Sequence, residues 1–166
     1  ILKDYVSAKK DYQRMLRINN RSVEALIGLS RISVIEKNLG QANEYADNAV
    51  AIAPSDAEAY IRRASVRKMM GNNTGAVDDL ILALSTGTNN PKALHELVEM
   101  GNTDYNAVMT GLSNAIKQAP KVGMFYYIRG IIAETHFNYV AALNDFKKIV
   151  NENLYNYHGI YKEISE

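Results

Sequence analysis

The segment closest to a catalytic motif is residues 95–99, His-Glu-Leu-Val-Glu, which is similar to the helical motif of zinc proteases. That motif needs two histidines four residues apart, so that both imidazoles lie on one face of a helix and bind the metal. Here Glu99 stands where the second histidine should be, and the other histidines, His136 and His158, lie far away in the sequence. We therefore expect no metal site, and we expect His95 to lie on a solvated helix edge.

The remaining polar motifs favour structure over chemistry. The glycines at positions 71 and 75 lack the following lysine and serine or threonine of a phosphate-binding loop, and a turn between helices explains them better. Asp78 and Asp79 are adjacent on a predicted helix, so their side chains point in different directions and we expect both to be solvated. Serine and histidine are too scattered to indicate a nucleophile. We therefore predict no catalytic residues, no cofactor and no enzymatic activity.

Composition limits the classes of partner. The chain has 166 residues, of which 47% are hydrophobic, and a net charge of +1. So small a charge argues against nucleic acid as a partner, because nucleic-acid binding relies on a strongly basic surface. The absence of cysteine excludes disulfides and thiolate chemistry. No apolar run approaches the ~20 residues of a membrane span and no signal-peptide pattern opens the chain. Because the chain starts at Ile1, as a trimmed fragment would, the compartment stays open.

The sequence repeats itself with a period of about 34 residues. Small residues recur in register, followed at fixed distances by a bulkier column and by a second small column. The three columns are Ala8, Ala42, Ala76, Val108 and Ala142; Tyr12, Ala46, Leu80, Leu112 and Phe146; and Met15, Ala49, Ala83, Ala115 and Ile149. A fixed period of this length is typical of stacked helical units that bury their apolar faces against their neighbours.

Helical periodicity dominates each unit, and turn signals divide it into two helices. Pro54 ends one helix, Ser55-Asp56 provides an N-cap for the next, and no alternating pattern indicates a strand. Small residues at the recurring columns allow two helices to approach closely, so we expect Ala76 and Ala83 to be buried. The sequence therefore predicts an all-α protein of antiparallel helix pairs.

These columns resemble the tetratricopeptide repeat (TPR) family. The match is close over residues 57–84 and again over residues 126–146, with Pro54 and Pro120 at the family's closing proline. The resemblance implies a right-handed α-solenoid. Asn20, Thr88 and Leu154 replace the proline elsewhere. The unit at about 89–120 is two residues short, so we expect its first helix (residues 91–100) to be shortened or the superhelix to be kinked there.

We divide the chain as a single repeat domain over residues 1–166. It comprises a partial repeat at about 1–20, repeats at 21–54, 55–88, 89–120 and 121–154, and the start of a further repeat or a capping helix at 155–166. Residues 2–18 are predicted to form the second helix of a repeat whose first helix is missing. Tyr157, Ile160, Tyr161 and Ile164 give the tail helical spacing. An alternative is that these unfinished ends pair between chains to form a homo-oligomer.

The resemblance implies that the first helices line a concave groove that binds a protein or peptide. We expect Arg62 to pair with a partner carboxylate and Tyr127 to act as an aromatic anchor. Such a mixture of apolar and charged side chains suits an extended peptide or a partner helix. The predicted groove residues are Glu24, Ile27, Arg31, Glu58, Ile61, Arg62, Ser65, Met69, Met124, Tyr127, Ile131 and Glu134.

The predicted function is a non-catalytic protein-interaction scaffold. Within the family, clamps for chaperone C-termini use lysines and asparagines at columns that here hold Ile27, Gly28, Arg31 and Glu58. Only Arg62 matches the residues of such a clamp, so we disfavour that role. Two alternatives stay open. The chain could be a regulatory or targeting segment of a larger enzyme or assembly, or an RNA-binding helical repeat, which the low net charge disfavours.

Overall fold

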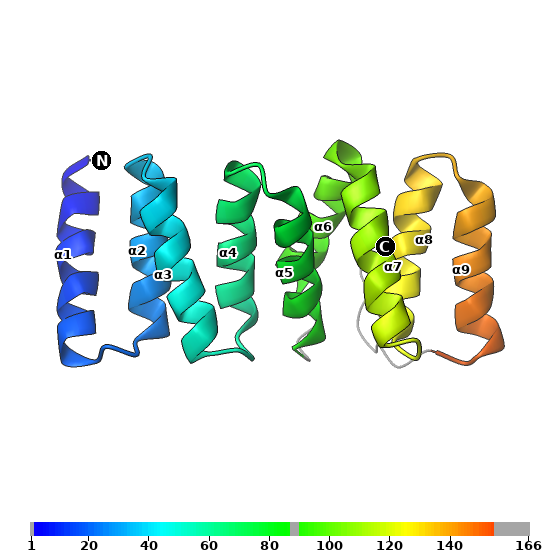
Figure 1. Ribbon diagram of the computed structural model, residues 1–166, viewed down its shortest axis with the longest axis horizontal. Helices are drawn as coiled ribbons and strands as arrows, with labels where there is room; N and C mark the ends of the chain where they lie inside the picture. Colours follow the sequence, from blue (N-terminus) through cyan, green and yellow to red (C-terminus); the bar gives the residue numbers. More distant parts are fainter. Residues whose placement is uncertain (1, 87–89, 155–166) are drawn as a thin grey trace. The chain divides into compact units, whose positions relative to one another are not determined.

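The computed structural model describes residues 2–86 and 90–154, which fold into nine helices without a strand (Figure 1). The all-α prediction is confirmed. The helices are α1 (Leu2–Ile18), α2 (Val23–Ile35), α3 (Leu39–Ile52), α4 (Ala57–Met69), α5 (Asn73–Ser85), α6 (Pro91–Thr103), α7 (Tyr105–Gln118), α8 (Gly123–Thr135) and α9 (Tyr139–Asn151).

The chain divides into two compact units, residues 1–86 and 87–166. In the N-terminal unit each helix packs on the next, and α2 also contacts α4. In the C-terminal unit α6 packs on α7, α7 on α8 and α8 on α9, and α6 also contacts α8. Within each unit the first helices of successive repeats therefore touch, whereas no such contact joins the described second helices α3 and α5, or α7 and α9. The first helices thus form the more closely spaced layer of each unit.

Short polar side chains cap nearly all the helices. Asp56 caps α4 as predicted, because its Oδ1 accepts the backbone N–H of Glu58 at 2.8 Å. Asparagine side chains cap α3, α5, α6 and α9 in the same way. In contrast, α8 follows Val122 and begins without a side-chain cap. These caps satisfy backbone donors that have no partner inside the helix, so they fix where each helix begins.

The repeat that is two residues short keeps a first helix of full length. With 13 residues, α6 is as long as α2, α4 and α8, so the predicted shortening is wrong. The difference lies in the turn: three residues (36–38, 70–72 and 136–138) separate the helices of the other repeats, and Asp104 alone separates α6 from α7. Asp104 both ends α6 and caps α7, accepting the N–H of Ala107 at 3.1 Å.

The small columns form the core of each helix pair. Ala76 and Ala83 are both 0% exposed, which confirms the prediction. Closer approach needs glycine: a Cβ at Gly28 would overlap the ring of Tyr12, and a Cβ at Gly130 would overlap the ring of Phe146. The aromatic ring therefore fills the space that the missing side chain leaves.

A buried ion pair braces α4 against α5. Arg63 donates two hydrogen bonds to Asp79, at 2.9 and 2.7 Å, and a third to Asp47 of α3 at 3.1 Å. The bond to Asp79 raises the pKa of Arg63, against the opposing effect of burial. Asp79 is 1% exposed, so the prediction that it is solvated is wrong, while its neighbour Asp78 is exposed as predicted. The adjacent positions differ because the 100° helical step turns Asp79 towards α4.

The same brace recurs in the C-terminal unit, 66 residues later. Arg129 donates two hydrogen bonds to Asp145, at 2.8 and 2.6 Å, and a third to Ser113 of α7 at 2.9 Å. This pairing raises the pKa of Arg129. Each arginine lies one turn after a tyrosine, Tyr60 or Tyr126, whose hydroxyl donates to the carbonyl of the closing proline at 3.0 or 3.2 Å. The brace thus ties the first helix to both neighbouring second helices.

Two of the predicted features lie outside the described residues. These are Thr88 and the helical spacing of Tyr157, Ile160, Tyr161 and Ile164. Within the described ranges, none of the helices combines the length and the apolar character that crossing a bilayer requires.

Candidate functional site

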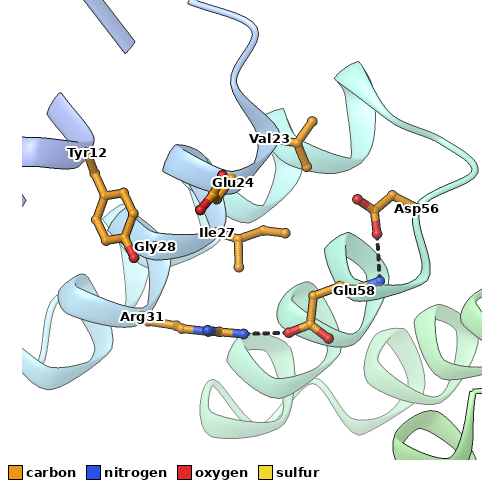
Figure 2. A pocket seen from close by; sticks show the side chains of 8 residues that line it. All are labelled: Tyr12, Val23, Glu24, Ile27, Gly28, Arg31, Asp56 and Glu58. Carbon is orange, nitrogen blue, oxygen red and sulfur yellow. Dashed lines mark hydrogen bonds and ion pairs between the residues drawn. The ribbon is translucent and has the colours of Figure 1, made fainter. Parts of the chain in front are cut away.

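One face of α2 opens into a pocket in the N-terminal unit. Glu24, Ile27, Gly28 and Arg31 follow one another at helical spacing and so lie on one side of the helix. The cavity has a volume of about 320 Å³. Four of its lining residues are predicted groove residues. The full lining is Tyr12, Val23, Glu24, Ile27, Gly28, Arg31, Asp56 and Glu58 (Figure 2).

The α1 wall of the pocket is Tyr12, which packs directly on the backbone of Gly28. A second contact holds the same two helices, because Lys9 Nζ lies 2.6 Å from Glu36 Oε2 at the end of α2. The close approach at Gly28 thus brings an aromatic side chain from a neighbouring helix to the edge of the α2 face. Figure 2 shows the tyrosine ring on the side of the pocket opposite α4.

The α4 wall is formed by the first turn of that helix. Asp56 caps the helix, and Glu58 follows in the first turn, where an acidic side chain also interacts favourably with the helix dipole. Glu58 Oε1 accepts a hydrogen bond from Arg31 Nη2 at 2.5 Å, which connects α2 to α4 across the pocket (Figure 2). The Arg31 side chain stays 53% exposed, so this ion pair belongs to an open surface.

The other predicted groove residues of this unit differ in accessibility. Ile61 is 1% exposed and belongs to the core, so it supports the groove from behind. Arg62 is half-buried and its Nη2 donates to Ser65 Oγ at 3.2 Å, which orients the guanidinium along α4. Met69 is 53% exposed at the end of the helix. Arg62, Ser65 and Met69 are therefore accessible at the surface, and Ile61 is not.

In the C-terminal unit the predicted groove residues share one face of α8. Met124, Tyr127, Ile131 and Glu134 follow at helical spacing. Met124 is buried, whereas Tyr127 and Ile131 are half-buried and Glu134 is exposed. The Tyr127 ring packs on Phe146 of α9, with 6.2 Å between ring centroids. This face offers a partly exposed aromatic and aliphatic surface, to which Met124 contributes support from the core.

Sequence reasoning missed half of the pocket lining. Tyr12 and Gly28 belong to different repeat columns, and their contact becomes visible only when the two helices are placed side by side. Asp56 was identified as a cap but not as part of a binding surface. The sequence did contain a signal for this contact. The bulky column holds an aromatic residue in α1, and so large a ring requires a small residue opposite it on the next helix.

The chemistry available at this surface is recognition by charge and apolar contact. Within residues 2–86 and 90–154, no three histidine, cysteine, aspartate or glutamate side chains gather in a way that could hold a metal ion. His95 and Glu99 are exposed, as predicted, and His136 packs on Tyr105 with its ring centroid 4.5 Å away. Carboxylates, one guanidinium and apolar side chains line the same hollow.

Known structures share this arrangement of helix pairs. The chain is similar to the crystal structure of MamA, with a TM-score of 0.56 and 22% identity over 91% of this chain and 90% of that one. It is similar to YrrB, described as a TPR protein with an unusual peptide-binding site, with a TM-score of 0.53 and 14% identity over 99% and 84% of the two chains.

A third similar structure is a tetratricopeptide repeat protein from Parabacteroides merdae, with a TM-score of 0.56 and 15% identity over 91% of this chain and 60% of that one. No protein-family model matches the sequence, and no curated protein matches it significantly. At these identities the likeness establishes the fold, which is the tetratricopeptide repeat fold.

Proposed function

We propose that this chain is a non-catalytic protein-interaction scaffold that binds an extended peptide or a partner helix along its first helices. The observation that carries the proposal is the pocket on α2. There, α2 and α4 bring Glu24, Ile27, Arg31 and Glu58 to one open surface, and α1 adds Tyr12. The exposed Arg31–Glu58 pair can fix the register of a partner, and the apolar side chains beside it can supply affinity.

Three further observations support binding on the first helices. Within each unit, first helices of successive repeats touch, so the exposed side chains on one side of these helices lie near one another and are called the strip here. On α8 the strip carries half-buried Tyr127 and Ile131, the kind of side chains that anchor interfaces. YrrB, which has the same fold, is described as having a peptide-binding site. Together these features favour a protein or peptide partner.

A pull-down with the intact chain tests the proposal. The chain is immobilised, and the proteins that it captures are identified by mass spectrometry. The same experiment is repeated with two variants, and the captured proteins are compared. The first, Arg62→Glu combined with Tyr127→Ala, changes the first helices at partly exposed positions. The second, Lys147→Glu, makes a charge change at an exposed position on the second helix α9.

We expect the first variant to lose the partner while its helical circular dichroism and melting temperature stay close to those of the parent chain. The second variant should retain the partner. A partner that survives the first variant and is lost with the second would place recognition on the second helices and overturn the proposal.

A further inference from the structure

The pocket on α2 carries an excess of negative charge, although the chain as a whole has a net charge of +1. Its lining contains three acidic residues, Glu24, Asp56 and Glu58, and one basic residue, Arg31. The guanidinium of Arg31 is already bonded to Glu58 at 2.5 Å. The surplus charge therefore lies with Glu24 and Asp56, and an anionic ligand would meet repulsion there.

The carboxylate of Asp56 is held in a fixed orientation. Its Oδ1 accepts the backbone N–H groups of Glu58, at 2.8 Å, and Ala59, at 3.4 Å, in the N-cap arrangement. Both capping bonds use the same oxygen, so Oδ2 is left to accept a bond from a ligand. Glu24 is exposed on the α2 face of the pocket, one turn before Gly28. Two carboxylates thus line the hollow, one from α2 and one from the residue that caps α4 (Figure 2).

The remaining walls are apolar. Val23 and Ile27 flank Glu24 along α2, and the Tyr12 ring closes the α1 side. A volume of about 320 Å³ is at the lower end of the range for ligand pockets, which is about 300–1,000 Å³. Lysine and arginine match such a site, because they bury an aliphatic stem on apolar surface and keep a charged head among polar groups.

We propose that this pocket binds a lysine or arginine side chain of the partner peptide. The stem lies on Ile27 and Tyr12, and the cation donates hydrogen bonds to Glu24 and to Asp56 Oδ2. This inference rests on the proposed function and adds a charge requirement to it. A basic residue seated here also fixes the register of the peptide on α2 and α4, because apolar contacts alone would allow it to slide.

The test is a nuclear magnetic resonance titration of the full chain, labelled with ¹⁵N, with three short peptides. All have acetyl and amide ends and the sequence Gly-Leu-X-Leu-Gly, where X is lysine, norleucine or glutamate. Norleucine keeps the aliphatic stem without the cation. We expect the lysine peptide to shift the amide signals of Glu24, Ile27 and Glu58, and to bind at least about tenfold more tightly than the norleucine peptide, as for a charged hydrogen bond.

Two variants with equal charge changes show which carboxylates cause the preference for the lysine peptide. Glu24→Gln combined with Asp56→Asn removes both carboxylates, and asparagine retains the capping ability of aspartate. The matched control, Glu44→Gln combined with Asp78→Asn, removes two exposed carboxylates from α3 and α5, outside the pocket. The pocket variant should lose the preference for lysine over norleucine, and the control should keep it. Glu24→Gln alone, at an exposed position, serves if the double variant is unstable.

The outcomes separate this inference from the proposed function. If lysine and norleucine peptides bind equally well at these residues, the first helices bind peptides but the charge requirement is wrong. If both double variants lose the preference equally, the effect is long-range and the pocket assignment is wrong. If none of the peptides shifts these signals, the pocket proposal fails, whereas the pull-down with the first-helix variant still decides the proposed function by itself.

Discussion

The two units of this chain share one internal brace and carry different surfaces. In both, an arginine on the first helix makes two hydrogen bonds to an aspartate 16 residues later, and a tyrosine one turn earlier bonds to the closing proline. The third partner differs: Arg63 reaches Asp47, whereas Arg129 reaches Ser113. The N-terminal brace also contains Arg67, whose Nη1 lies 2.9 Å from Asp79, and alanine occupies the equivalent position 133.

The predicted groove columns of the first helices vary far more than the braces. At three successive columns, α2 and α4 present a mixture of charged and aliphatic residues, and α8 presents apolar ones. The columns are Glu24, Glu58 and Met124; Ile27, Ile61 and Tyr127; and Arg31, Ser65 and Ile131. The comparison teaches that repeated positions hold the helices together, while positions that change from repeat to repeat differentiate the surface.

The largest expected effect is loss of stability on Asp79→Ala. The substitution leaves the guanidinium groups of Arg63 and Arg67 partly buried with only Asp47 to pair with, and breaking a buried pair typically costs about 3–5 kcal/mol. Asp145→Ala should cost less, because only Arg129 loses its partner there. Urea unfolding followed by circular dichroism measures both. Asp78→Ala, at the exposed neighbour, should change stability by no more than about 0.5 kcal/mol. Equal losses at positions 78 and 79 would contradict the role of the brace.

A second effect of intermediate size concerns the small columns. Ala76→Leu should destabilise the chain by about 1–3 kcal/mol, because a side chain added at a position with 0% exposure must displace its neighbours. Ala51→Leu, on the exposed side of α3, is the matched control and should be nearly neutral. Urea unfolding again provides the measurement. A loss below a few tenths of a kcal/mol at Ala76 would mean that this column does not set the distance between helices.

The smallest expected effect lies in the turns between paired helices, where one position has a positive φ in several repeats. This position is Gly71 in one repeat, with a φ of 78°, and Lys37 in another, with a φ of 61°. Lys37→Gly should therefore stabilise the chain and Gly71→Ala should destabilise it, each by about 1 kcal/mol, because only glycine adopts this conformation without strain. Thermal unfolding distinguishes the two signs. Shifts of the melting temperature in the same direction would show that the turns are not equivalent.

Much of the fold follows from the sequence because repetition shows the same local rule several times. Asp56 is recognisable as a cap, and Ala76 and Ala83 as buried, from their columns alone. Asp79 escaped recognition because its partner Arg63 lies on another helix, and adjacency to Asp78 suggested two solvated carboxylates. The 66-residue spacing between Arg63 and Arg129, and between Asp79 and Asp145, was the available signal.

The candidate site was less accessible to sequence reasoning than the fold. Periodicity placed Glu24, Ile27 and Arg31 on one face of a helix, because spacing along one helix determines this directly. It could not show that Tyr12 closes the pocket, since that depends on the packing of α1 against Gly28. Nor could it show that Ile61 is buried while its neighbour Arg62 is only half-buried, because burial depends on the neighbouring helices.

The most direct test of the central claim, that recognition lies on the first helices, is amide hydrogen exchange of the intact chain with and without the partner captured in the pull-down. Binding slows exchange where the partner covers or rigidifies the backbone. We predict slower exchange in α2, α4 and α8, with little change in α3, α5 and α9. Slower exchange confined to the second helices, with α2, α4 and α8 unchanged, would contradict the account.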